Sequence, residues 1–255
     1  MIITRLIYLK RRREGRLTTR RRVVTFLLIL FVLYVPGGLI YFSFYSHATD
    51  NALKYMNSTD TVAVSEIDQG YLFDGPGTRD AIAFYPGAKV DEKAYAPLMQ
   101  MIADAGIDCF LIKMPLHMAF LGKNKADDVI DEYNYENWYI SGHSLGGAMA
   151  GIYAASHGDK IRGMILLAAY STAKIDDSVS ALAITATNDH VMDWEDYNEN
   201  KGNLPLNTTE VSIEGGNHSQ FGDYGFQRGD GEATISQDEQ MEQVRDAVRK
   251  LVNGE

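Results

Sequence analysis

The stretch that decides the fold is Gly142-His143-Ser144-Leu145-Gly146, which lies between an apolar segment and a run of small residues. The apolar segment before it predicts a buried strand, and the Gly- and Ala-rich segment after it predicts the start of a helix. The two glycines permit a sharp turn because they lack a Cβ atom. Such a turn would lift the Ser144 hydroxyl out of a sheet and present it as a nucleophile. The alternative is a glycine-rich turn without chemistry, since Gly-x-Ser-x-Gly also occurs by chance.

Apolar runs alternate with helical patterns on both sides of this stretch. Strands that are apolar throughout and separated by helices predict a mostly parallel sheet with helices on both faces, the α/β class. The expected strands are residues 61–65, 71–73, 81–85, 107–113, 138–140, 162–168, 179–185 and 210–213, the first two as a hairpin. The expected helices are residues 91–105, 126–130, 146–156, 191–200 and 236–252.

Charged residues are distributed unevenly along the 255-residue chain, which is long enough for one α/β domain and a short extension. Residues 1–22 hold nine of the 24 basic residues and one of the 34 acidic ones. Residues 23–255 therefore carry 15 basic and 33 acidic side chains, a net charge of −18. An acidic body of this kind repels a phosphate backbone, so we expect no nucleic-acid partner.

A segment without charged side chains, residues 23–45, follows the basic cluster. About 20 helical residues span the roughly 30 Å core of a bilayer, so this segment is long enough to be a transmembrane anchor. Pro36, Gly37 and Gly38 predict a kink or an early end of its helix. A cleavable signal peptide is the alternative, although its apolar region usually has only about 7–15 residues.

These features predict four parts of the chain. They are a basic cytoplasmic tail over residues 1–22, a transmembrane anchor over 23–45, a polar linker over 46–60 and an α/β domain over 61–255. Because basic residues favour the cytoplasmic side of a membrane, we expect the N-terminus inside the cell and the domain outside it. The expected location is the cell membrane, in a single-pass arrangement. The sequence does not indicate an oligomeric state.

A serine hydroxyl needs an adjacent base to become a good nucleophile, and the base needs an acid that orients it. In sheets of this kind the order along the chain is Ser, then Asp or Glu, then His. Of the six histidines, only His190 and His218 lie well downstream of Ser144. His218 follows the last expected strand in a glycine-rich loop that could bring its imidazole over the turn. It is the favoured base, and His190 is the alternative.

Asp189 is the favoured acid. It follows the expected strand at 179–185, and loops at the carboxyl ends of parallel strands are where such sheets place their chemistry. Asp193 is the second candidate. Capping the N-terminus of a helix would be the ordinary structural use of Asp189.

Backbone N–H groups are expected to stabilise the oxyanion of a tetrahedral intermediate. One donor is expected from Leu145, the residue after the nucleophile, and another from the loop after the third strand. Gly87 allows a close backbone approach in that loop, and either Ala88 or Lys89 would donate.

Five segments, in the same order along the chain, together resemble the α/β-hydrolase superfamily and, within it, a small bacterial group of serine hydrolases. They are residues 84–90 (FYPGAKV), 94–98 (AYAPL), 113–116 (KMPL), 142–147 (GHSLGG) and 215–225 (GGNHSQFGDYG). The resemblance covers residues 61–252. It implies a triad of Ser144, Asp189 and His218, and hydrolysis of acyl esters or related bonds with no metal and no organic cofactor. Oxyanion loops of lipases and esterases often begin with His-Gly, whereas this chain has Pro86-Gly87.

A largely apolar segment, residues 114–121, follows an expected strand and could line a pocket for an acyl group, since binding pockets are mostly apolar. Contacts with the substrate are expected from Met114, Leu116, Met118 and Phe221, with ordinary core packing as the alternative.

The sequence thus predicts a membrane-anchored serine hydrolase that cleaves a small acyl ester through an acyl-enzyme. Amidase, peptidase or acyltransferase activity on cell-envelope material is a second hypothesis. A third is a catalytically silent surface protein that keeps the fold for binding. The presence of Ser144, Asp189 and His218 together argues against the third hypothesis, because drift would erase at least one of them.

Overall fold

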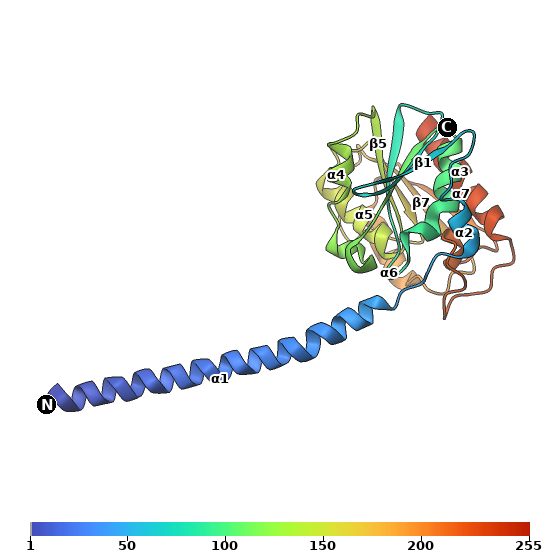
Figure 1. Ribbon diagram of the computed structural model, residues 1–255. Coiled ribbons are helices and arrows are strands. Elements are labelled where there is room, and N and C mark those ends of the chain that lie inside the picture. The colour runs from blue at the N-terminus through green and yellow to red at the C-terminus, as the bar shows by residue number, and fades with distance from the viewer. Residues whose placement is uncertain (1) are drawn as a thin grey trace. The chain divides into compact units, whose positions relative to one another are not determined.

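The computed structural model describes residues 2–255, which divide into two units, one ending at Phe44 and one from Tyr45 to Glu255 (Figure 1). The first unit is helix α1 (Ile2–Ser43). Its segment Thr19–Ser43 is long and apolar enough to cross a membrane, which is weak evidence because a signal sequence has the same properties. The helix continues past Pro36 to Ser43, so the expected early end is not observed.

The second unit, called the folded unit below, is built on one sheet with the strand order β1-β2-β4-β3-β5-β6-β7-β8. β2 is antiparallel to β1 and to β4, and the other neighbours are parallel. The prediction of a mostly parallel sheet is therefore confirmed. The strands are β1 (Ala63–Ile67), β2 (Gly70–Asp74), β3 (Asp80–Tyr85), β4 (Asp108–Ile112), β5 (Asn137–His143), β6 (Gly163–Leu167), β7 (Ser180–Ala186) and β8 (Thr209–Ile213).

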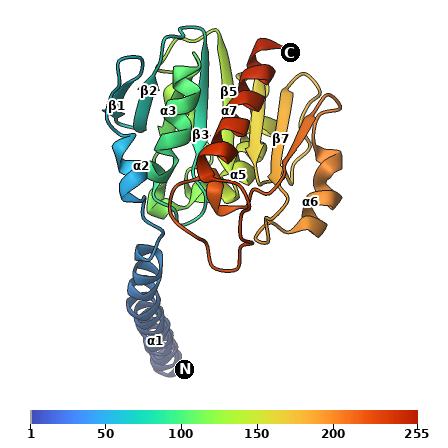
Figure 2. The same ribbon diagram turned by 90° about the vertical axis from the view of Figure 1, so that its right-hand side faces the viewer.

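Helices cover both faces of the sheet, and Figure 2 shows α3 and α7 in front of the strands and α5 behind them. In β3, Ile82 and Phe84 pack with side chains of α3 and α7, whereas Ala81 and Ala83 pack with those of α5. Successive strand residues point to opposite faces, so a strand covered on both sides is apolar throughout. The helices of the folded unit are α2 (Asp50–Lys54), α3 (Ala96–Asp104), α4 (Ala126–Ile130), α5 (Leu145–Ser156), α6 (Trp194–Asn200) and α7 (Gln237–Asn253), joined by short 3₁₀ turns at Glu92–Tyr95, Pro115–His117, Ala119–Leu121, Lys201–Asn203 and Ser219–Phe221.

The segment expected to be a linker, residues 46–60, is instead integrated into the folded unit. Ser46 pairs with Val90 in a parallel bridge, beside the loop that follows β3. The side chains of Thr49 and Asn51 donate hydrogen bonds to the Asp223 carboxylate, at 2.7 and 2.9 Å. Two of the polar side chains in this segment, which predict a linker by composition, are thus hydrogen-bonded to a distant part of the folded unit.

Candidate active site

Ser144 occupies a sharp turn between the end of β5 and the start of α5. Its backbone angles, φ 53° and ψ −125°, are ones that residues with a Cβ rarely adopt. The flanking glycines explain how the chain can turn there. A Cβ on Gly146 would lie 2.1 Å from the carbonyl oxygen of Tyr85, and one on Gly142 would lie 2.5 Å from the carbonyl carbon of Gly146. The strand, turn and helix that the sequence predicts around Ser144 are present.

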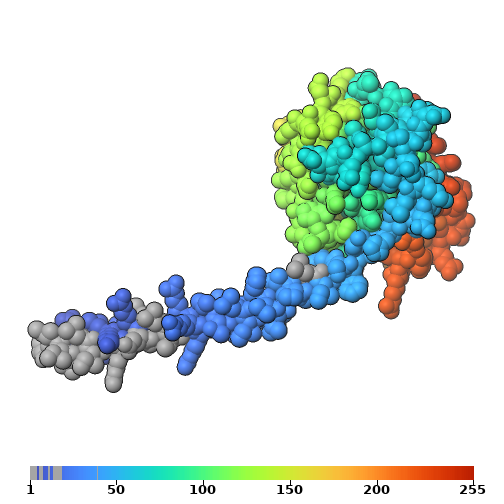
Figure 3. Space-filling view, viewed as in Figure 1, coloured from blue at the N-terminus to red at the C-terminus, as the bar shows by residue number. Residues whose placement is uncertain are grey.

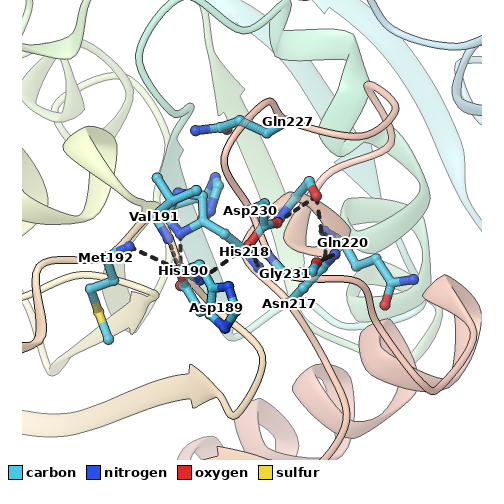
Figure 4. A network of polar contacts seen from close by, with 12 residues as sticks. Asp189, His190, Val191, Met192, Asn217, His218, Gln220, Gln227, Asp230 and Gly231 are labelled. Atoms are coloured by element: carbon cyan, nitrogen blue, oxygen red, sulfur yellow. Dashed lines mark hydrogen bonds and ion pairs between the residues drawn. The ribbon is translucent and has the colours of Figure 1, made fainter.

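Asp189 and His218 meet although they come from different loops, the first after β7 and the second after β8 (Figure 4). His218 Nδ1 lies 2.7 Å from Asp189 Oδ2, and both side chains are almost completely buried. The other carboxylate oxygen, Oδ1, accepts hydrogen bonds from the backbone N–H groups of Val191 and Met192, each at 2.8 Å. These contacts hold the carboxylate in place so that it fixes the orientation of the imidazole.

Ser144 and His218 line one pocket of about 240 Å³. Its other lining residues are Leu145, Ala148, Ala168, Ala169, Tyr170, Val191, Met192 and Asp193. Ser144 and His218 thus border the same small space, where a substrate carbonyl could lie between them. Within residues 2–255 no hydrogen bond joins Ser144 to His218, and such bonds are often long before a substrate binds.

The two alternatives left open for the base and the acid differ in their surroundings. His190 is exposed, does not line the pocket, and donates its backbone N–H to Asp230. Asp193 lines the pocket, but its carboxylate caps α6 by accepting from the N–H groups of Glu195 and Asp196. Geometry therefore favours His218 and Asp189.

Three successive N–H groups in the loop after β3 have different partners. The N–H of Gly87 donates to the Tyr95 hydroxyl at 3.0 Å, and that of Lys89 donates to the carbonyl of His117 at 2.8 Å. The N–H of Ala88 has no acceptor among the described residues. Of the two expected donors in this loop, only Ala88 is thus free to serve an oxyanion. Leu145, the first residue of α5, lines the pocket beside Ser144.

A second buried histidine connects this loop to the turn at Ser144. The Tyr95 hydroxyl lies 2.8 Å from His143 Nδ1 and also accepts the Gly87 N–H, so it donates its own proton to the ring. Burial lowers the pKa of His143 well below its usual range, and neighbouring His218 acts in the same direction. His143 therefore stays neutral, as a structural link between Gly87 and the nucleophile.

Asp230 is a supporting residue that no pattern in the sequence predicts. Its carboxylate accepts hydrogen bonds from the Ser219 hydroxyl at 2.7 Å and the Ser219 N–H at 2.8 Å. Weaker bonds come from the backbone of His190 and His218, so Asp230 ties together the loops that carry the acid and the base. Nothing in its local sequence marks this role, because all but one of its partners lie at least eleven residues away along the chain.

The four residues expected to contact the substrate do not line the pocket of Ser144. Met114 and Phe221 are buried in the core on opposite faces of the sheet. Leu116 is exposed, and Met118 is partly exposed on the same loop. The alternative, ordinary core packing, therefore describes Met114 and Phe221.

No group of three or more His, Cys, Asp or Glu side chains suitable for a metal ion is found in the part of the chain that the structure describes.

A larger cavity, of about 480 Å³, lies at the opposite edge of the sheet, where β7, β8 and the end of α7 meet. It contains neither Ser144 nor either histidine candidate.

Comparison with known proteins agrees with this architecture. A profile described as "Alpha/beta hydrolase family" matches residues 81–242, which is well over half of the chain. The chain belongs to the α/β-hydrolase family. A comparison with curated protein sequences gave no match.

Three solved structures share the fold at low sequence identity. Est1E from Butyrivibrio proteoclasticus is 14% identical, with a TM-score of 0.54 over 76% of this chain and 100% of its own. The dienelactone hydrolase from Anabaena variabilis is 14% identical, with a TM-score of 0.54 over 76% of this chain and 95% of its own. The monoacylglycerol lipase of Paleococcus ferrophilus is 15% identical, with a TM-score of 0.54 over 69% of this chain and 96% of its own. Similarity at this level shows the common fold alone.

Proposed function

We propose that this α/β-hydrolase is a membrane-anchored serine esterase that cleaves a small carboxylic ester through an acyl-enzyme. The observation that carries the proposal is the buried Asp189–His218 pair, at 2.7 Å, whose imidazole shares one small pocket with the strained Ser144. A buried carboxylate bonded to Nδ1 leaves Nε2 to accept a proton. The esterase, lipase and dienelactone hydrolase among the structural neighbours are consistent with hydrolysis.

In the proposed mechanism His218 Nε2 removes the proton from Ser144 as the serine oxygen attacks the ester carbonyl. The imidazolium that forms is stabilised by Asp189. The N–H groups of Leu145 and Ala88 stabilise the negative oxygen of the intermediate. His218 then returns its proton to the leaving alcohol, and an acyl-enzyme remains. Water, activated by the same imidazole, releases the acid and regenerates the serine hydroxyl.

The pocket sets the expected size of the substrate. Its volume, about 240 Å³, lies below the usual 300–1,000 Å³ range of ligand sites, and three of its lining residues are alanines. A short acyl or alcohol group therefore fits beside Ser144 better than a long one.

In the same proposal residues 23–45 anchor the chain in the cell membrane, with the N-terminus in the cytoplasm and the folded unit outside. We also propose that the chain belongs to the small bacterial serine hydrolase group that residues 84–90 and 142–147 resemble.

A fluorophosphonate probe tests the nucleophile directly, because it reacts with activated serines. The wild-type protein should be labelled, Ser144→Ala should not, and Ser144→Ala should lower turnover of a short ester by about 10⁴–10⁶-fold. Ser178→Ala, at an exposed serine in the turn before β7, serves as the matched control and should be labelled like the wild type. Well-folded wild-type protein that resists the probe and cleaves no ester would refute the proposal.

A further inference from the structure

An exposed apolar cluster lies on the loop between β4 and α4, residues 113–125. Leu116, Phe120 and Leu121 are exposed by 44, 46 and 48%, all within six residues of one another. Leu116 and the next residue both have positive φ angles, near 54°, which is costly for residues with a Cβ atom. Three large, partly exposed apolar side chains on one strained loop are typical of a surface that contacts a partner.

The same loop is basic, although the body of the protein is acidic. Lys113, Lys123 and Lys125 lie on it, and residues 113–125 contain no Asp or Glu. None of the three ammonium groups forms an ion pair with a carboxylate in the described residues. In a chain whose residues 23–255 carry a net charge of −18, this local excess of positive charge suits an anionic partner.

The loop also contacts the segment by which the chain reaches the folded unit. The ring of Tyr45, the first residue of that unit, stacks on His117 with centroids 3.9 Å apart. His117 in turn accepts the N–H of Lys89, from the loop that carries Ala88. The apolar cluster therefore lies at the carboxyl edge of the sheet, the edge at which Ser144 and His218 are found.

A second exposed loop begins beside a contact of residues 45–51. Phe226, exposed by 63%, and Arg228 are on the segment that follows Asp223. Asp223 is the carboxylate that binds the side chains of Thr49 and Asn51. Figures 2 and 3 show this orange-red loop, between β8 and α7, protruding from the folded unit. Residues 45–51 thus contact His117 on the first loop and Asp223, which directly precedes the second.

We propose that residues 113–125 and 225–228 form a lipid-docking surface, through which the enzyme takes ester substrates from an anionic bilayer. The inference rests on the proposed membrane anchor. A bilayer is the occupant because residues 45–51, which contact His117 and Asp223, directly follow in the chain the segment proposed to span the membrane. The apolar side chains would enter the interface between headgroups and acyl chains, and the lysines would bind anionic headgroups.

Quenching by brominated lipids tests docking without requiring catalysis. Full-length Phe120→Trp is reconstituted into vesicles of phosphatidylcholine and phosphatidylglycerol with brominated acyl chains, and the wild-type fluorescence of Trp138 and Trp194 is subtracted. Leu206→Trp, at an exposed leucine on the opposite edge of the sheet, is the control. Quenching at position 120 but not at 206 supports the proposal. Quenching at neither position, or equally at both, overturns it.

A comparison of two substrates tests delivery from the bilayer. The double variant Phe120→Ser and Leu121→Ser should lower turnover of an ester embedded in the vesicle at least about five-fold and leave turnover of a water-soluble short ester unchanged. Leu206→Ser should affect neither substrate. Equal loss with both substrates, or loss with neither, overturns the proposal. Selective quenching without any ester cleavage would instead retain the docking surface and reject the proposed esterase.

Discussion

At the scale of a single residue, Ser144, the proposed nucleophile, has a strained backbone conformation. A non-glycine residue at φ 53° and ψ −125° costs of the order of 1–3 kcal/mol and persists only where the surroundings over-determine it. Here β5, α5 and the loop after β3 provide that constraint. The Asp189 carboxylate is held by hydrogen bonds from the backbone N–H groups of Val191 and Met192, and the His218 ring is held by its hydrogen bond to Asp189.

Asp189→Asn tests the role of the acid. The amide oxygen can still accept from Val191 and Met192, but its NH₂ group would face His218 Nδ1 and favour the tautomer that cannot accept a proton from Ser144. We expect kcat for a short ester to fall about 10⁴-fold without loss of thermal stability.

The matched control for this test is Asp193→Asn. Asn caps a helix as well as Asp does, so α6 should keep its cap and the enzyme its activity. Wild-type turnover by Asp189→Asn would exclude Asp189 as the orienting acid.

The buried His143 predicts how stability depends on pH. Its pKa in the folded state lies well below the usual value near 6.5, so the unfolded chain binds the extra proton. The stabilisation is complete above about pH 6.5 and is lost as the pH falls below it, with a slope of up to about 1.4 kcal/mol per pH unit. Urea unfolding of the wild type between pH 7.5 and 5, set beside His143→Asn, measures this contribution.

His143→Asn retains an acceptor for the Tyr95 hydroxyl and removes the titrating ring, so its stability should depend less steeply on pH. His190→Asn, at an exposed histidine, should keep the wild-type slope. If His143→Asn retains the same slope, another group is responsible for it.

At the scale of elements, the close approach of α5 to the sheet depends on glycine. Gly146 lies against the carbonyl oxygens of Tyr85 and Pro86, with room for no Cβ. Gly147 likewise faces Ala169 of the neighbouring loop. Without these residues the helix could not begin directly at the turn that presents Ser144.

Gly146→Ala should therefore destabilise the protein by at least about 2 kcal/mol, because helix and loop must move apart. The free energy of unfolding from urea titration measures the effect. Gly202→Ala is the control, since nothing beyond the adjoining backbone lies within 4 Å of the position that its Cβ would take, and it should change stability by less than about 0.5 kcal/mol. Equal stability of the two variants would show that α5 can shift without cost.

At the scale of the whole molecule, charge and hydropathy are segregated along the chain. The basic residues 1–22 precede an uncharged segment, and an acidic folded unit follows. This order predicts that the full-length protein stays in the membrane fraction after an alkaline carbonate wash. Leu28→Arg together with Val32→Arg places two charges in the proposed span, each costing about 2.5–3.5 kcal/mol at a helix centre, and should release the protein.

Leu206→Arg, in the folded unit, should leave the wild-type distribution unchanged. A wild-type protein found in the soluble fraction would contradict the anchor. A chain shortened to begin near residue 46 would identify residues 23–45 as a cleaved signal peptide instead.

Local signals account for the parts of the fold that the sequence predicted well. The strand, turn and helix around Ser144 depend on glycine positions and apolar runs within about twenty residues, which the chain displays directly. For residues 46–60 composition predicts a linker, because it shows polar side chains but not their partners. Asp223, which binds two of them, lies more than 170 residues away along the chain.

The sequence by itself determined the α/β class, the position of the nucleophile turn and the candidates for base and acid, because these follow from backbone propensities and chain order. Only the tertiary structure decided that His218, and not His190, meets Asp189, that Lys89 is bonded to His117, and that the loop at 113–125 is exposed. Each of these outcomes depends on which loops converge at one edge of the sheet. That convergence arises from packing between segments distant in sequence, which no local pattern encodes.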